Sequence, residues 1–279
     1  MNTVAVVGVG LIGASFGLAL REAGFTGEIL GVSSEPALRA GLRSGAISTS
    51  GTLEDAAARA DLIYLAQPVD RILATLQDLG PLLSSPGLVT DAGSTKAAIV
   101  QKASACLPIG SFLGGHPMTG KEQRGAEAAE ASLFRGRPYV LTPTAPESPA
   151  MQDFRSWLER MQVHLVELSA ERHDQVVAFT SHLPQLLSTA LAATLERQSD
   201  PYLAHVFGSG LLDMTRLAMS SPEVWRSVLE TNKSVVPVTL QALIDTLVRL
   251  KTELTEGDPV GLFPDAGKFA SRIRTRSSQ

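Results

Sequence analysis

The sequence predicts an α/β protein, in which a doubly wound, mostly parallel sheet is followed by an all-helical C-terminal domain. Short apolar runs alternate with helical patterns through the first half of the chain, as in a parallel sheet covered by helices. Most of these runs are continuous rather than alternating, which is typical of strands buried on both faces. Beyond residue 168 the strand patterns stop and long helical patterns replace them.

The elements of the first domain follow from these runs. We expect strands over residues 4–7, 28–32, 62–66, 88–91, 112–114, 139–141 and 163–166. Helical patterns lie between them, among others over residues 12–23, 69–79 and 96–105. The first domain is therefore predicted to cover residues 1–168.

The second domain, residues 169–279, is predicted to contain only helices. Helical patterns cover residues 170–198, 202–219, 222–250 and a last segment from 261. Ser221 before Pro222 has the composition of a helix start, since serine caps and proline suits the first turn. Long apolar helices in so small a unit seldom bury their apolar faces alone, so we expect a homodimer through these helices.

Composition excludes several classes of protein. The chain has 279 residues, of which 44% are hydrophobic, and a net charge of −4, which argues against a nucleic-acid partner. A single cysteine, Cys106, excludes a disulfide framework, and the acidic and histidine residues lack the spacing of metal ligands. The uncharged N-terminal run lacks the positive residues of a signal peptide and is broken by glycines. We therefore expect a cytoplasmic protein, without a metal and away from membranes.

The motif Gly8-x-Gly10-x-x-Gly13 directly follows the first predicted strand and opens a helix. This context predicts a Rossmann dinucleotide-binding site. Gly8 permits the tight turn, Gly10 lets the backbone approach the pyrophosphate, and Gly13 allows close packing of helix on strand. Leu11 and Ile12 begin the helix, whose free N–H groups bind phosphate.

The residues after the second strand bear on the choice between NAD and NADP. NAD enzymes usually carry Asp or Glu there, but this chain has Ser33 and Ser34. The serines tolerate a 2′-phosphate, which Arg39 or Arg43 could approach from the following helix. Glu35 could instead take the acidic role. We favour NADP slightly, with NAD or dual use left open.

A histidine follows the strand near residue 112, in the segment Gly114-Gly115-His116-Pro117. We interpret the paired glycines as a turn, and Pro117 biases His116 to extended geometry. Histidine exchanges protons near neutral pH. Ser94, after the strand over residues 88–91, is expected at the same sheet edge. A proton acceptor beside a hydride carrier predicts a dehydrogenase that acts on a hydroxyl.

Together, several segments resemble the prephenate and arogenate dehydrogenases of tyrosine biosynthesis. The resemblance covers nearly the whole chain and rests on GVGLIGAS, DAGSTK, GGHPMTGKE, SHLP, DMTR and PEVWR. It implies oxidative decarboxylation of a cyclohexadiene acid to a phenol, with a nicotinamide taking the hydride.

The resemblance also implies roles for individual residues. His116 contacts the substrate hydroxyl and accepts its proton, and Ser94 bonds both that oxygen and His116. Arg216 binds the ring carboxylate, while Glu122 pairs with Arg216 and gates the pocket. Trp225 packs near the site.

Four further positions are less sharply defined. Lys96 is expected to support the loop on the cofactor side. His182 precedes Pro184 in a helical pattern, where it either lines the pocket or satisfies the backbone that the proline frees. His173, like the other remaining histidines, is interpreted as solvated. Many family members have a histidine where this chain has Gln185, a position that helps to recognise the substrate side chain. A neutral amide suits either substrate, and we place arogenate and NADP slightly higher than is usual for the family.

Two other functions are weighed against this interpretation. A β-hydroxyacid dehydrogenase of the hydroxyisobutyrate or 6-phosphogluconate type uses a helical lysine as its acid or base, and Lys233 could take that place. In such an enzyme, however, the Gly-Gly-His-Pro-Met segment would have no role. A nicotinamide-sensing regulator without catalysis would have no use for Ser94, His116 and Arg216 together.

Overall fold

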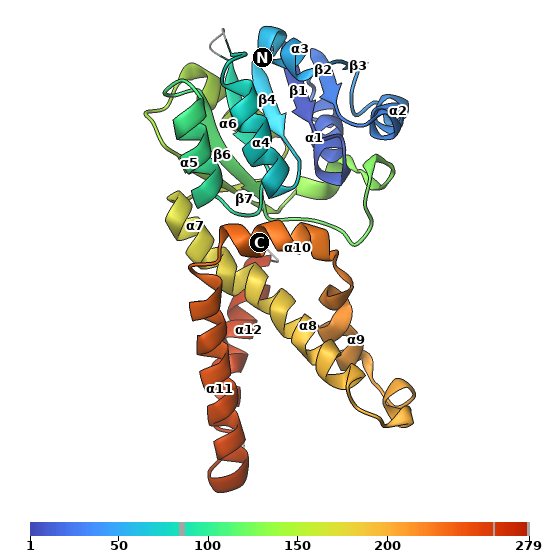
Figure 1. Ribbon diagram of the computed structural model, residues 1–279, viewed down its shortest axis with the longest axis vertical. Coiled ribbons are helices and arrows are strands. Elements are labelled where there is room, and N and C mark those ends of the chain that lie inside the picture. The colour runs from blue at the N-terminus through green and yellow to red at the C-terminus, as the bar shows by residue number, and fades with distance from the viewer. Residues whose placement is uncertain (84–86, 259, 278–279) are drawn as a thin grey trace. The chain divides into compact units, whose positions relative to one another are not determined.

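The computed structural model describes residues 1–83, 87–258 and 260–277. Its strands form one eight-stranded sheet in the order β3-β2-β1-β4-β5-β6-β7-β8 (Figure 1). The strands are β1 (Thr3–Val7), β2 (Glu28–Val32), β3 (Thr49–Ser50), β4 (Leu62–Leu65), β5 (Leu88–Asp91), β6 (Phe112–Pro117), β7 (Pro138–Pro143) and β8 (His164–Glu167). Among the described strands, only the β6–β7 pairing is antiparallel. The predicted doubly wound, mostly parallel sheet is confirmed.

Helices cover both faces of the sheet because its strands are apolar on both. Along β1, Val4 and Val6 belong to one buried cluster and Ala5 and Val7 to the other, as the two-residue period of a strand requires. The first cluster includes residues of α1 (Leu11–Glu22) and α6 (Pro149–Arg160). The second includes residues of α3 (Leu53–Arg59), α4 (Val69–Leu79) and α5 (Ala97–Cys106). Helix α2 (Glu35–Ser44) follows β2.

Strand β6 differs from its prediction. It continues to Pro117, so Gly114 and Gly115 lie within a strand and do not form a turn. The glycines are required because neighbouring strands approach closely. A Cβ atom at Gly115 would lie 2.6 Å from the carbonyl oxygen of Asp91. His116 keeps the extended geometry that was predicted for it, paired with Val140 of β7.

The remaining helices of the first compact unit, Met1–Asn232, follow the sheet. They include α7 (Ala170–Val177), a π-helical segment (Ala178–His182), α8 (Leu183–Glu196), α9 (Ser209–Thr215) and α10 (Pro222–Thr231). Pro184 cannot donate a backbone hydrogen bond, and the wider π turn lies directly ahead of it. The segment Ala170–Glu196 is long and apolar enough to cross a membrane by length and composition alone, although its first turns are charged.

The second compact unit, Lys233–Gln279, consists of α11 (Val236–Glu256) and α12 (Phe263–Ser277). Both helices leave large apolar side chains exposed: Val238, Ile244, Leu247, Val248, Leu254, Phe263, Phe269 and Ile273.

Candidate active site

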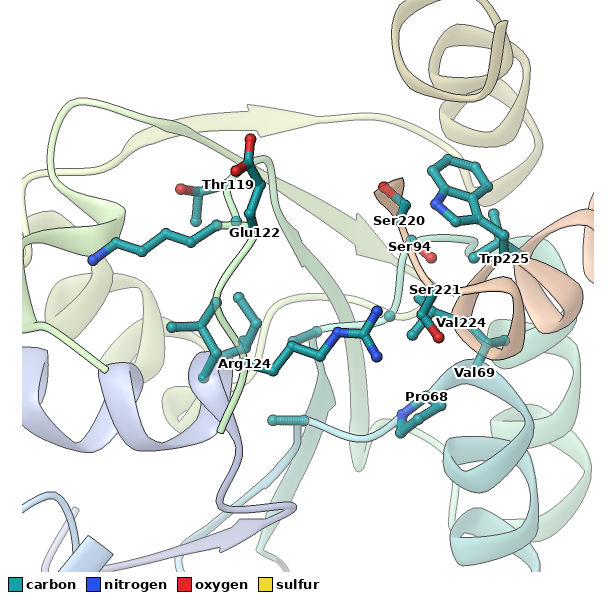
Figure 2. Close-up of a pocket in the computed structure, with 18 of the residues that line it drawn as sticks. Pro68, Val69, Ser94, Thr119, Glu122, Arg124, Ser220, Ser221, Val224 and Trp225 are labelled. Atoms are coloured by element: carbon teal, nitrogen blue, oxygen red, sulfur yellow. The ribbon is translucent and has the colours of Figure 1, made fainter. Parts of the chain in front are cut away.

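A cavity of about 640 Å³ lies at the carboxyl ends of the central strands of the first unit. It collects residues from the first turn of α1, the β5–α5 loop, the end of β6 and the segment that begins α10 (Figure 2). Of the residues predicted from sequence, those that line it are Leu11, Ile12, Ser94, His116, Glu122, Arg216 and Trp225. Residues from both halves of the sequence thus share one space.

The glycine loop has room for a phosphate on one side only. Gly8 has a φ of +96°, which side chains rarely adopt, and a Cβ atom at Gly13 would lie 2.1 Å from the Gly8 carbonyl oxygen. Among the described residues other than Gly10 and its two chain neighbours, no heavy atom lies within 4 Å of a Cβ placed at Gly10. Gly10 precedes α1, whose first turn carries no acidic residue. The loop therefore fits a dinucleotide phosphate bound at the N-terminus of α1.

The residues after β2 carry paired charges rather than a lone acid. Ser33 and Ser34 are exposed, and Glu35 forms an ion pair with Arg39. Arg43, further along α2, lies 3.9 Å from Glu127. Both arginines are exposed and held by acids that a bound anion could replace.

His116 is buried and neutral. Only 9% of its surface is exposed, and its Nδ1 lies 2.8 Å from Nε2 of His173. Burial, and then the positive charge that His173 and Lys96 can carry, lower the pKa of His116 well below its usual 6.5. Ser94 lines the cavity with His116, but the hydrogen bond that holds the His116 ring is made with His173.

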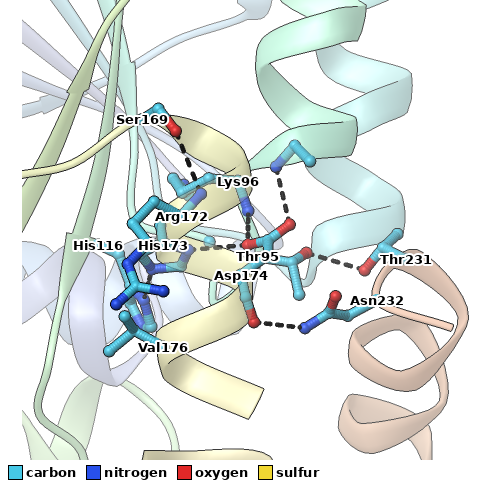
Figure 3. Close-up of polar contacts among 12 residues, drawn as sticks. Thr95, Lys96, His116, Ser169, Arg172, His173, Asp174, Val176, Thr231 and Asn232 are labelled. Atoms are coloured by element: carbon cyan, nitrogen blue, oxygen red, sulfur yellow. Dashed lines mark hydrogen bonds and ion pairs between the residues drawn. The ribbon is translucent and has the colours of Figure 1, made fainter. Parts of the chain in front are cut away.

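The interpretation of His173 as solvated is wrong. Its side chain is fully buried, and its Nδ1 lies 2.8 Å from Oδ1 of Asp174 (Figure 3). Ala170, His173, Asp174 and Val177 form the buried side of α7. Their spacing of three, four and seven residues is that of an inward helix face, and it is the signal that sequence reasoning missed.

Lys96, which is predicted to support the loop on the cofactor side, lies beneath the cavity and is not among the described residues that line it. Its side chain is fully buried, where its ammonium donates to the Gly115 carbonyl oxygen at 2.7 Å and pairs with Asp91. Asp91 also accepts hydrogen bonds from the backbone N–H groups of Gly93 and Gly115. Lys96 and Asp91 thus hold the ends of β5 and β6 together beneath the cavity, out of reach of a ligand.

Among the described residues, two arginines line the cavity. The predicted ion pair between Arg216 and Glu122 is present, with Nη1 and Oε1 3.1 Å apart. Arg124, which sequence reasoning did not single out, extends across the cavity toward Val69 and Ser221 (Figure 2). No pattern in the sequence distinguishes Arg124 from an ordinary surface arginine.

Gln185 and His182 are buried behind the cavity and are not among the described residues that line it. The Gln185 amide donates to the Leu217 carbonyl oxygen at 2.8 Å and so supports the backbone next to Arg216. His182 packs perpendicular to Trp225, with ring centroids 5.8 Å apart. In the described part of the chain, its Nε2 has no hydrogen-bond partner. Burial lowers the pKa of His182 to about 4.

No metal centre is evident in this region. Among the described residues, no group of three or more His, Cys, Asp or Glu side chains is arranged to hold a metal ion.

Two family models cover most of the chain. The model of the prephenate dehydrogenase nucleotide-binding domain matches residues 16–167, and that of the prephenate dehydrogenase dimerization domain matches residues 169–264. Prephenate dehydrogenase of Bacillus subtilis is 32% identical over 94% of this chain and 72% of its own length. Cyclohexadienyl dehydrogenase of Zymomonas mobilis is 28% identical over 91% of this chain and 89% of its own.

Solved structures agree with these matches. Prephenate dehydrogenase from Aquifex aeolicus, in complex with hydroxyphenyl propionate and NAD+, superposes with a TM-score of 0.90 at 30% identity over 98% of each chain. Synechocystis arogenate dehydrogenase gives a TM-score of 0.81 at 31% identity, over 97% of this chain and 99% of its own. A 3-hydroxyisobutyrate dehydrogenase from Mycobacterium tuberculosis reaches a TM-score of only 0.50 at 14% identity, over 88% of this chain and 94% of its own, a likeness of fold alone.

Proposed function

The chain belongs to the prephenate dehydrogenase family of NAD(P)-dependent oxidoreductases, and we propose that it oxidatively decarboxylates prephenate or arogenate in tyrosine biosynthesis. The products are 4-hydroxyphenylpyruvate or tyrosine, together with carbon dioxide and the reduced cofactor. The proposal rests chiefly on one observation, the shared cavity. There the helix start at Leu11 and Ile12 meets Ser94, His116 and Arg216.

Each side chain has a step to perform. Bound at the glycine loop, the nicotinamide cofactor supplies the acceptor for the hydride of the carbon that bears the hydroxyl. His116, neutral at physiological pH, accepts the hydroxyl proton, and such assistance accelerates reactions by about 10²- to 10⁴-fold. Ser94 donates to the same oxygen. Arg216 exchanges Glu122 for the ring carboxylate, which must stay ionised to leave as carbon dioxide.

For the cofactor we favour NADP+ over NAD+. Ser33 and Ser34 leave space for a 2′-phosphate where NAD enzymes usually place a carboxylate. Arg39 and Arg43 are exposed and paired with acids, and exposed pairs of this kind are worth only about 0–1 kcal/mol. A phosphate with up to two negative charges would compete well for either guanidinium.

The two candidate substrates differ in their side chain, and we favour arogenate slightly over prephenate. Both candidates carry two carboxylates, and the cavity has two guanidinium groups, those of Arg216 and Arg124. We assign Arg124 to the side-chain carboxylate. Gln185 does not line the cavity, but its hydrogen bond to Leu217 fixes the backbone next to Arg216. Trp225 packs at the same end of the cavity.

The protein is proposed to work as a cytoplasmic homodimer. Apolar side chains of the C-terminal helices are exposed in the single chain, including Phe179, Leu212 and Leu247. A family model of a dimerization domain covers this region, and a second copy of the chain would bury these side chains.

One assay tests the proposal. Prephenate and arogenate are each combined with NAD+ and NADP+, and the absorbance of the reduced nicotinamide is followed together with release of carbon dioxide. We expect turnover with at least one pair and the higher kcat/KM with NADP+. A hydroxyisobutyrate control should be inert. Turnover of the control alone, or carbon dioxide release without reduction of the cofactor, would refute the function.

A further inference from the structure

We infer that His173 and Asp174 are positioning residues that fix the tautomer of His116, so that its Nε2 is held free of a proton toward the cavity. The hydrogen-bond chain follows from the geometry alone. Its catalytic consequence rests on the proposed function.

This series of hydrogen bonds starts at Asp174. Its Oδ1 accepts the backbone N–H of Lys96 at 2.7 Å, and its Oδ2 accepts that of Ala97 at 2.9 Å (Figure 3). Backbone N–H groups only donate, so both oxygens act as acceptors at the positive N-terminus of α5, where an ionised carboxylate is favoured. The same Oδ1 lies 2.8 Å from Nδ1 of His173. That nitrogen therefore carries the proton of the hydrogen bond.

The proton on Nδ1 determines what the rest of the His173 ring does. Burial lowers the pKa of His173 below its usual 6.5, so the ring is neutral near neutral pH. A neutral imidazole with a proton on Nδ1 has only a lone pair on Nε2. This Nε2 lies 2.8 Å from Nδ1 of His116, and so His116 must donate.

The same reasoning then applies to His116. With its proton on Nδ1, the neutral ring has a bare Nε2. Nothing described in the protein hydrogen-bonds this nitrogen, and His116 lines the cavity. A base must present a lone pair to the proton that it accepts. The orientation is therefore set before any substrate binds, at no cost during the reaction.

Two neighbouring side chains hold the turn that carries His173 and Asp174 in place. The Ser169 hydroxyl caps α7 by accepting the Arg172 N–H at 3.2 Å. The amide of Asn232, at the end of α10, donates to the Asp174 carbonyl oxygen at 3.0 Å. All of these groups belong to the first compact unit, and Asn232 is 1% exposed. The turn that carries His173 and Asp174 is thus fixed at both ends.

Nitrogen-15 NMR of the full chain tests the tautomer directly. The protein is labelled with ¹⁵N-histidine and two-bond ¹H–¹⁵N spectra are recorded near neutral pH, without substrate or cofactor. The signals lost in His116→Asn identify the ring. We expect Nδ1 of His116 to be protonated and Nε2 bare, the opposite of the tautomer that free neutral histidine prefers. A proton on Nε2 of His116 in the wild-type protein overturns the inference, whether or not any variant folds.

Two variants of His173 provide the matched comparison. His173→Leu removes the acceptor, so His116 should revert toward the Nε2–H tautomer. His173→Gln keeps an oxygen that can accept from His116 and should restore the Nδ1–H tautomer. A His116 spectrum unchanged in His173→Leu overturns the inference.

Kinetics supply the catalytic readout. A general base is worth about 10²- to 10⁴-fold, so loss of tautomer control in His173→Leu should lower kcat by about 10- to 100-fold and leave KM within about 3-fold. His173→Gln should recover most of kcat. If the wild-type protein turns over neither substrate, the proposed function fails while the NMR result stands. Normal turnover with Nε2 protonated, in contrast, defeats this inference alone.

Discussion

The Arg216 guanidinium lies 3.1 Å from the Glu122 carboxylate, and more than half of each side chain is exposed. Exposed ion pairs contribute about 0–1 kcal/mol to folding, so this pair does little for stability. Its consequence is positional, because it keeps a guanidinium in the cavity beside a carboxylate that a ligand can displace.

Arg216→Ala is therefore expected to act on substrate binding. A hydrogen bond to a charged group is worth about 1.5–3 kcal/mol, which corresponds to a rise in KM of about 10- to 150-fold, with a modest loss in kcat and an unchanged melting temperature. Arg59→Ala is the control, since Arg59 pairs with Glu28 at the surface and does not line the cavity. An unchanged KM would show that another group binds the ring carboxylate.

His116→Asn should separate chemistry from binding. The amide has no group that can accept the substrate proton at the position of Nε2, but its nitrogen can still donate to His173. We expect kcat to fall by about 10²- to 10⁴-fold, while calorimetry finds cofactor and substrate affinities preserved. His205→Asn, at an exposed position, should leave both unchanged. Retained turnover in His116→Asn would exclude His116 as the base.

Sequence patterns captured the sheet because its strands are continuous apolar runs with helices between them. They missed β3, which is only two exposed residues long, and they ended β6 too early at its glycines. Glycine is usually a sign of a turn. Here the reason for glycine is crowding by Asp91 and Thr142 on the neighbouring strands, which sequence alone does not reveal.

Sequence patterns likewise predicted one part of the candidate site and missed another. Residues in short motifs, such as Ser94 and His116, were found because each motif follows an apolar run, although His116 itself lies within β6. The residues that support them were not found, because their contacts join distant segments of the sequence. Asp174 accepts hydrogen bonds from Lys96 and Ala97, which lie 78 and 77 positions away. The buried partners of Lys96 were missed for the same reason. Its motif lies at the cavity, but its side chain turns into the core toward Asp91.

Two glycines of the phosphate loop allow binding and folding to be tested separately. A Cβ atom at Gly10 meets open space, whereas one at Gly13 would lie 2.1 Å from the Gly8 carbonyl oxygen. Gly10→Ala should therefore keep the melting temperature of the free protein but raise the cofactor Kd at least about 10-fold, since the methyl group occupies the side that the pyrophosphate approaches.

Gly13→Ala should instead destabilise the protein itself, by about 1–3 kcal/mol or more, because the packing of α1 on β1 must open. Melting curves and cofactor titrations of the two variants give the comparison. Equal loss of stability in both variants would contradict the open geometry at Gly10.

The burial of His182 predicts how the free energy of unfolding changes with pH. Its pKa is about 4 in the folded protein, because of burial, and 6.5 when unperturbed. Between these values the unfolded chain binds a proton that the folded chain does not. The free energy of unfolding is therefore fully retained above pH 6.5 and falls as the pH drops toward 4, by up to about 1.4 kcal/mol per pH unit for this group.

His116 and His173 add to this slope, since the pKa of each is also lowered in the folded state. His182→Asn cannot titrate, yet its amide oxygen can accept from Asn232 where Nδ1 does now. It should be less stable at neutral pH, because it loses the packing on Trp225, but its stability should fall less steeply with acid. Urea unfolding from pH 7 down to about 4.5 measures the slope, with His205→Asn as the exposed control. An identical slope in His182→Asn and the wild-type protein would mean that His182 takes up its proton without unfolding.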